Sequence, residues 1–173
     1  RDAMDECFQR LNRLMDMDIK ALLYPVDADN KLIDAEKKSL GDFRIAQAVV
    51  FCFEYALARW LMGNGVTPHA MIGYSFGEYT AVCISGVLNL DEILELIVAR
   101  GQLLNSWPGG GMISVPLSRE KVEPLLDAGV SLAIDNGDSC VVAGAGGAVA
   151  KLAQKPQQDR IVTLKLPASH RFH

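Results

Sequence analysis

Hydrophobic positions in the first 65 residues predict a helical segment built around one buried helix. Apolar side chains recur at helical spacing along one stripe of residues 2–16. A polar stretch up to about residue 42 then predicts a loop. Residues 43–62 are apolar almost all round, which is typical of a buried helix, and Gly63-Asn64-Gly65 predicts its end.

The pattern changes after residue 65 and predicts a strand followed by two helices. Residues 69–72 are a candidate short strand, and a glycine-containing turn separates them from a helix of small residues at 78–85. A further helix is predicted at 92–104, with Asp91 as its cap. A buried helix followed by strand, turn and helix is typical of α/β proteins. We therefore expect residues 1–109 to form a large α/β subdomain with a parallel sheet.

Shorter elements follow the glycine-rich run at 107–111, which indicates a hinge. The pattern predicts strands at 112–115, 130–134, 140–143 and 161–166 and helices at 118–126 and 148–154. Asn136-Gly137 between two apolar runs predicts a hairpin. The order βαββαβ is that of a ferredoxin-like subdomain, which we place at residues 110–166. We expect residues 167–173 to return to the large subdomain.

Composition and charge exclude several classes of function. Apolar residues make up 50% of the 173 residues and charged residues 22%, which is enough for a real core. The net charge of −4 argues against a nucleic-acid surface. No apolar run approaches the roughly 18 residues of a membrane span. The four cysteines are scattered without metal-ligand spacing, so we expect reduced thiols and no metal in a cytoplasmic protein. We expect no signal segment, and we interpret the chain as a piece of a longer protein.

The most informative motif is Gly73-Tyr74-Ser75-Phe76-Gly77, a G-x-S-x-G run between the predicted strand and helix. In that context the motif predicts a nucleophile elbow, in which a strained turn exposes the serine hydroxyl. The amide of Phe76 would then donate to an oxyanion. The alternative is a tight turn that carries an ordinary serine.

A nucleophilic serine needs a base, and the chain contains three histidines. His69 precedes the predicted strand, at the end away from the elbow, which favours a surface role. His170 and His173 follow the last predicted strand and are the better candidates. Arg100 lies late in an apolar helix, where it could complement the helix dipole or grip a substrate carboxylate with its two-pronged fork. Spacing alone leaves both roles of Arg100 open.

Several stretches closely resemble the malonyl-CoA:acyl-carrier-protein transacylases and the acyltransferase domains of polyketide and fatty acid synthases. GYSFGEYTAVCISGVLNLDEILELIVARGQLL is similar to their active-site stretch with G-H-S-x-G-E and a later arginine. RIAQAVVFCFEYALARWL resembles their T-Q-P-A helix, VSLAIDNGDSCVVAGAGGAVAKL their small-subdomain hairpin, and LPASHRFH their segment ending in H-A-F-H. The resemblance covers nearly the whole chain.

The resemblance assigns roles to individual residues. It makes Ser75 the nucleophile, His173 the base and the Phe76 amide an oxyanion donor. Arg100 would hold the free carboxylate of an extender acyl group, and Gln47 is similar to a pocket-lining glutamine. Tyr74, His170 and Phe172 would lie around the substrate. In the family, a phenylalanine directly before the last histidine, as at Phe172, accompanies selection of malonyl over methylmalonyl groups.

Some positions depart from the family pattern. Tyr74 stands where the family usually has histidine, Ala48 replaces proline, and Arg171 replaces a small residue. The family's opening strand with its G-Q-G-S-Q motif has no counterpart, so we expect an incomplete large subdomain that lacks the first strand and one oxyanion donor.

The resemblance implies transfer of an acyl group, malonyl or a similar dicarboxylic acyl group, from CoA to the phosphopantetheine thiol of an acyl carrier protein through an acyl-serine. It implies no metal or redox cofactor, and neighbouring synthase domains such as a ketosynthase. Two alternatives remain open at this point. One is a serine hydrolase of the esterase or thioesterase kind, and the other is a non-catalytic domain of a synthase.

Overall fold

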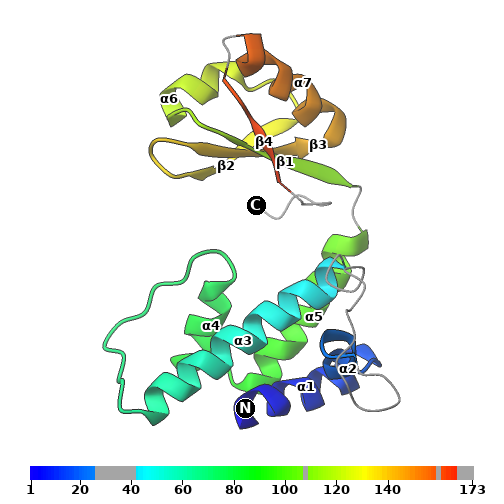
Figure 1. Cartoon of the computed structure of the whole chain (residues 1–173), viewed down its shortest axis with the longest axis vertical. Coiled ribbons are helices and arrows are strands. Elements are labelled where there is room, and N and C mark those ends of the chain that lie inside the picture. The colour runs from blue at the N-terminus through cyan, green and yellow to red at the C-terminus, as the bar shows by residue number, and fades with distance from the viewer. Residues whose placement is uncertain (26–41, 107–108, 159–160, 167–173) are drawn as a thin grey trace. The chain divides into compact units, whose positions relative to one another are not determined.

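The chain forms two compact units, residues Arg1–Leu103 and Leu104–His173 (Figure 1). The computed structural model describes residues 1–25, 42–106, 109–158 and 161–166. The division falls within α5 (Leu90–Ser106), ahead of the boundary at residue 109 expected from the glycine-rich run. The segment 167–173, predicted to return to the large subdomain, lies outside the described residues.

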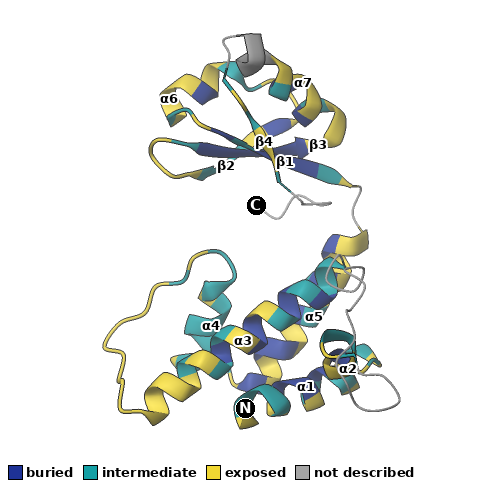
Figure 2. Ribbon diagram, viewed as in Figure 1, coloured by how far each residue is buried: buried dark blue, intermediate teal, exposed yellow. Residues whose placement is uncertain are grey.

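The regular secondary structure in the described part of the first unit is all helical. Its further helices are α1 (Asp2–Met15), α2 (Ile19–Leu23), α3 (Phe43–Gly63) and α4 (Gly77–Ile84). One cluster of buried apolar side chains joins α1, α3 and α5, and Figure 2 shows buried positions along each of these helices. Phe51, Leu11 and Leu94 are among its largest fully buried members. The apolar stripe of α1 therefore folds as the sequence predicts, because it must be removed from water. The prediction that α3 is buried all round is wrong for the described residues, since Phe53 and Trp60 on this helix are 60% and 62% exposed.

The start of α5 corrects one prediction. Asn89 caps this helix, since its side-chain oxygen accepts hydrogen bonds from the amides of Asp91 and Glu92 at 3.0 Å each. Glu92 returns a bond by accepting from the Asn89 amide at 2.8 Å, which completes a capping box. Asp91, which we expected to be the cap, instead accepts from Arg10 of α1 at 2.6 Å.

The parallel sheet expected around the elbow is not formed by the described residues of the first unit. Residues 69–72 have no strand partner, and Ile72 at their end is 99% exposed. A strand exists only when a neighbouring strand pairs its backbone groups, and the described residues of this unit contain no other strand. The strand prediction at 69–72 is therefore wrong for the chain as described.

Helix α3 is apolar enough to meet a membrane-span criterion. An 18-residue window within its 21 residues has a mean hydropathy of 1.3, so by length and composition alone it could cross a bilayer. This corrects the expectation that no apolar run approaches the length of a membrane span. Core helices of globular domains meet the same criterion. Here one face of α3 is buried against α1 and α4, and Glu54 on α3 accepts a hydrogen bond from Thr80 of α4 at 2.7 Å.

The second unit confirms the predicted βαββαβ order. Its strands are β1 (Gly110–Val115), β2 (Val130–Asp135), β3 (Cys140–Ala145) and β4 (Leu164–Lys165). They form an antiparallel sheet in the order β2-β3-β1-β4, the arrangement of a ferredoxin-like fold. The β2–β3 register shifts between Leu132 and Ile134, which marks a bulge.

The connections of the second unit follow from turn and helix chemistry. Gly137 adopts a φ of +84° in the β2–β3 hairpin and donates to the Asp135 side chain at 2.9 Å. The helix predicted over 118–126 divides into α6 (Arg119–Val122) and a 3-10 turn at Glu123–Leu125. Pro124 has no amide hydrogen to continue the α-helical bonding, which accounts for the change. The longer α7 (Gly146–Gln158) packs on β1 and β3 through Val149 and Leu152.

Candidate active site

The turn before α4 has the backbone geometry of a nucleophile elbow. Ser75 has a φ of +53°, a left-handed conformation that costs energy for any residue with a side chain. Only Ser75 and Asp16 adopt positive φ among the described non-glycine residues, and Asp16 is a helix C-cap. Backbone strain of this kind is concentrated at functional sites. The geometry therefore favours the elbow over an ordinary tight turn.

Gly73 makes this turn possible because it lies against the first turn of α4. A Cβ atom at position 73 would overlap the backbone of Gly77 and Glu78. The segment that enters the turn therefore passes too close to the helix for any side chain at this point. In contrast, a Cβ at Gly77 would meet nothing within 4 Å.

The backbone amides at the start of α4 differ in their bonding. The Gly77 amide donates to the Tyr74 carbonyl at 3.0 Å, and the Glu78 amide donates to the Ser75 carbonyl at 3.3 Å. Among the described residues, the Phe76 amide makes no backbone hydrogen bond. This amide directly follows the serine and lies at the positive end of a helix, so it suits an oxyanion donor.

Arg100 on α5 is bonded to Gln47 on α3. The Arg100 Nη1 donates to Gln47 Oε1, and Gln47 Nε2 donates to the Phe43 carbonyl at 3.2 Å. Gln47 is only 5% exposed, and the second bond fixes its amide with the oxygen toward Arg100.

Three aromatic rings surround the same guanidinium. Its central carbon lies 5.4 Å from the ring centre of Phe76, 5.8 Å from that of Phe43 and 5.9 Å from that of Tyr79. Phe76 and Tyr79 stack on each other with ring centres 4.8 Å apart. The cation therefore lies beside the residue that immediately follows Ser75.

The structure thus brings together four of the predicted site residues, Gln47 on α3, Ser75 and Phe76 in the turn before α4, and Arg100 on α5. Tyr74 flanks the serine and is 71% exposed. His170, Phe172 and His173 lie outside the described residues. His69 is exposed, as its predicted surface role requires.

Sequence reasoning missed two residues at this site, Phe43 and Tyr79. Phe43 is one helical turn before Gln47, and Tyr79 is three residues after Phe76, so each shares a helix face with a residue that was identified. That spacing was the available signal. It could not show that both rings face a cation on a third helix.

The buried thiols nearby are poor nucleophiles. Cys7 and Cys52 are fully buried in the core of the first unit. A hydrogen bond with the Cys7 thiol, together with burial, raises the pKa of Cys52 far above its ordinary value. Burial also raises the pKa of Cys83. Because the thiolate is the reactive form, these cysteines do not compete with Ser75 as acceptors.

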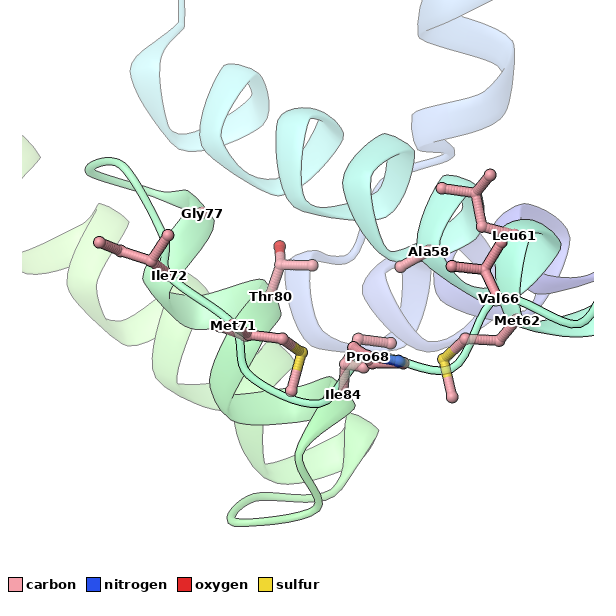
Figure 3. Close-up of a pocket in the computed structure, with 11 residues that line it drawn as sticks. Ala58, Leu61, Met62, Val66, Pro68, Met71, Ile72, Gly77, Thr80 and Ile84 are labelled. Carbon is pink, nitrogen blue, oxygen red and sulfur yellow. The ribbon is translucent and has the colours of Figure 1, made fainter.

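A separate apolar cavity lies between the C-terminal half of α3, helix α4 and the extended segment before the elbow (Figure 3). Its volume is about 250 Å³. None of its lining side chains is titratable: they are Ala58, Leu61, Met62, Val66, Pro68, Met71, Ile72, Gly77, Thr80, Ala81 and Ile84. The cavity therefore offers no acid or base, and the one hydroxyl in its lining, that of Thr80, donates to Glu54.

Comparison with known proteins places this site in a family. Residues 1–173 match the family model described as acyl transferase domain. The chain is 33% identical over 177 residues to the spectinabilin polyketide synthase system protein NorB of Streptomyces orinoci, a match that covers 99% of this chain and 8% of that protein. The chain spans only 3% and 8% of the lengths of two curated relatives that it matches.

Solved structures agree with this assignment. The acyl transferase domain of ZmaA has 38% identity and a TM-score of 0.83, over 98% of this chain and 40% of that one. The acyl transferase domain of SpnD, in complex with 2-(pent-4-yn-1-yl)malonyl, has 36% identity and a TM-score of 0.81, over 98% and 39%. These likenesses confirm the two-subdomain α/β fold class predicted from the sequence. The chain belongs to the acyl transferase domain family, and its relatives include polyketide synthases.

Proposed function

We propose that this chain carries the active serine of an acyltransferase that moves a malonyl-type extender group from CoA to the phosphopantetheine thiol of an acyl carrier protein. The observation that carries the proposal is the placement of the Arg100 guanidinium against Phe76, directly after the strained Ser75. A nucleophile and a fixed cation then belong to one small site. The family assignment supports the transfer of an acyl group.

In the first half-reaction, Ser75 Oγ would attack the thioester carbon while His173 accepts the hydroxyl proton. The Phe76 amide would donate to the oxygen that becomes negative in the tetrahedral intermediate. Collapse of that intermediate breaks the carbon–sulfur bond, and the CoA thiol leaves with the proton. The product is an acyl ester of Ser75.

In the second half-reaction, the carrier protein's phosphopantetheine thiol would attack the same carbon. His173 would take the thiol proton and return it to Ser75 Oγ as the ester bond breaks. The reaction requires only the acyl-CoA and the partner's phosphopantetheine, and we expect no resident metal or redox cofactor. Neighbouring synthase domains such as a ketosynthase, and a cytoplasmic location, are parts of the same proposal.

Arg100 would select acyl groups that carry a free carboxylate. A guanidinium has five N–H donors in a planar fork that matches a carboxylate. One nitrogen is bonded to Gln47, and the fork can offer its remaining donors to the substrate. The malonyl carboxylate fits this requirement, and an acetyl group does not. The SpnD domain, solved with a substituted malonyl group, is consistent with this class of substrate.

Transfer and hydrolysis can be distinguished by following the acyl group. The full-length protein would be given radiolabelled malonyl-CoA with and without holo carrier protein, and label on the carrier protein and free malonate would both be measured. We expect carrier-protein labelling to exceed hydrolysis by at least about tenfold, and Ser75→Ala to abolish both. Free malonate formed at an equal rate in the presence of the carrier protein would favour a hydrolase instead.

A further inference from the structure

The surroundings of Arg100 are unusual for a largely enclosed cation. Among the described residues, Arg100 forms no ion pair with an aspartate or glutamate, whereas Arg10, Arg44 and Arg119 each do. Its described partners are one neutral amide, from Gln47, and three aromatic rings. The positive charge is therefore held in place without being neutralised by any carboxylate in the described part of the chain.

Aromatic rings hold a cation differently from a carboxylate. The negative face of an aromatic ring attracts the guanidinium, but the ring is a weak hydrogen-bond acceptor. It therefore leaves the N–H donors largely unused. A carboxylate, in contrast, would occupy two donors and compete with an anionic ligand. A guanidinium held by rings keeps both its charge and its donors for a substrate.

We propose that Phe43 and Tyr79 are positioning residues that hold Arg100 ready for a substrate carboxylate. Phe43 begins α3 and Tyr79 lies on the first turn of α4, so the two rings approach the cation from different helices, at 5.8 Å and 5.9 Å. With the Gln47 bond, they limit the orientations of a long, flexible side chain before the substrate arrives. Binding then costs less conformational freedom. The inference rests on the proposed carboxylate-binding role of Arg100.

The test compares two substrates that differ in the carboxylate. Phe43→Leu and Tyr79→Leu would be made in the full-length protein, with Tyr79→Phe as the conservative variant that keeps the ring. Phe53→Leu is the matched control, because Phe53 lies on α3 but is 60% exposed and makes no described contact with Arg100. KM and kcat would be measured for malonyl-CoA, together with the slower loading rate from acetyl-CoA.

We expect each leucine variant to raise the KM for malonyl-CoA about 5- to 10-fold, which is within the range for loss of a partly buried cation–π contact. The kcat should change less than about twofold, because the rings do not touch the reacting atoms. Loading from acetyl-CoA should be unchanged, and Tyr79→Phe and Phe53→Leu should resemble the unmodified protein.

Three outcomes would overturn the inference. If Phe43→Leu and Tyr79→Leu slow malonyl and acetyl loading by the same factor, the rings only support the fold. If Arg100→Ala removes the malonyl preference while both leucine variants keep the original KM, the rings do not position Arg100, although the proposed function stands. If Arg100→Ala also leaves the malonyl KM unchanged, the carboxylate role of Arg100 fails, and this inference fails with it.

Discussion

At the scale of single residues, Gly73 carries the strictest requirement of the elbow. A side chain there would overlap backbone atoms of Gly77 and Glu78, and backbone cannot move aside as a flexible side chain can. We predict that Gly73→Ala lowers the free energy of unfolding by at least about 2 kcal/mol and prevents acyl loading. Chemical denaturation and mass spectrometry would measure the two effects.

The matched control is Gly63→Ala, at the end of α3, where a Cβ would meet nothing within 4 Å. It should change the free energy of unfolding by less than about 1 kcal/mol and leave loading intact, because alanine is the better helix former. Equal effects of the two substitutions would contradict the close approach described for Gly73.

The residue scale also shows what sequence reasoning could reach at the site. A motif and a family resemblance single out Ser75 and Arg100 from the sequence, and the structure places Phe76, which follows Ser75, against the Arg100 guanidinium. Phe43 and Tyr79 were not predictable, because their role depends on a cation that comes from another helix. The cap of α5 was predicted at Asp91 and not at Asn89 for the same reason, since a contact from another helix decides between them. Both are good capping residues, and only the bond from Arg10 shows that Asp91 is engaged elsewhere.

At the scale of elements, the first turn of α3 matters because it carries both Phe43 and Gln47. Asp42 caps this helix: its carboxylate accepts from the Arg44 amide at 2.9 Å and from Arg44 Nη2 at 2.6 Å. The Arg44 side-chain bond lowers the pKa of Asp42 below its ordinary value of 3.8. A lowered folded-state pKa stabilises the folded protein above the unfolded pKa, and this contribution disappears as the pH falls through the folded value.

We predict that Asp42→Ala lowers the free energy of unfolding by about 1 kcal/mol at pH 7, the usual cost of losing a cap. The difference from the unmodified protein should stay constant down to about pH 5 and shrink as the pH drops below 3.8. Denaturant titrations between pH 3 and pH 7 would measure it. A difference that grows toward low pH would have the wrong sign for this carboxylate.

Elements were predicted with unequal success, for a physical reason. Helices α1, α3 and α5 and the β2–β3 hairpin depend on local signals: apolar periodicity, caps and the Asn136-Gly137 turn. The strand at 69–72 depends on a partner strand, and residues 1–25 and 42–106 contain none. α2 is only five residues long, too short for a periodic signal, and was missed.

At the scale of the whole molecule, the two units have separate cores. The first cluster draws its buried residues from α1, α2, α3 and α5, and the clusters on the two faces of the sheet draw theirs from β1 to α7. Mutations at sites without shared partners usually have additive effects on stability. The two cores should therefore respond separately to substitution.

Val142 on β3 is fully buried and provides a test. We predict that Val142→Ala destabilises the second unit by roughly 1.5–3 kcal/mol, from lost burial and the cavity that remains. Hydrogen exchange should become faster at amides of β1 and β3 and stay unchanged along α3. Faster exchange along α3 of similar size would show that the cores act as one.

Intact-protein mass spectrometry can establish whether Ser75 forms an acyl ester and whether Arg100 selects the acyl group. The full-length protein and its Ser75→Ala and Arg100→Ala variants would be mixed separately with malonyl-, methylmalonyl- and acetyl-CoA. We predict a malonyl adduct that maps to the peptide containing Ser75, disappears in Ser75→Ala, and gives way to acetyl in Arg100→Ala. A malonyl adduct that persists in Ser75→Ala, or no adduct from any of the three donors, would contradict the account.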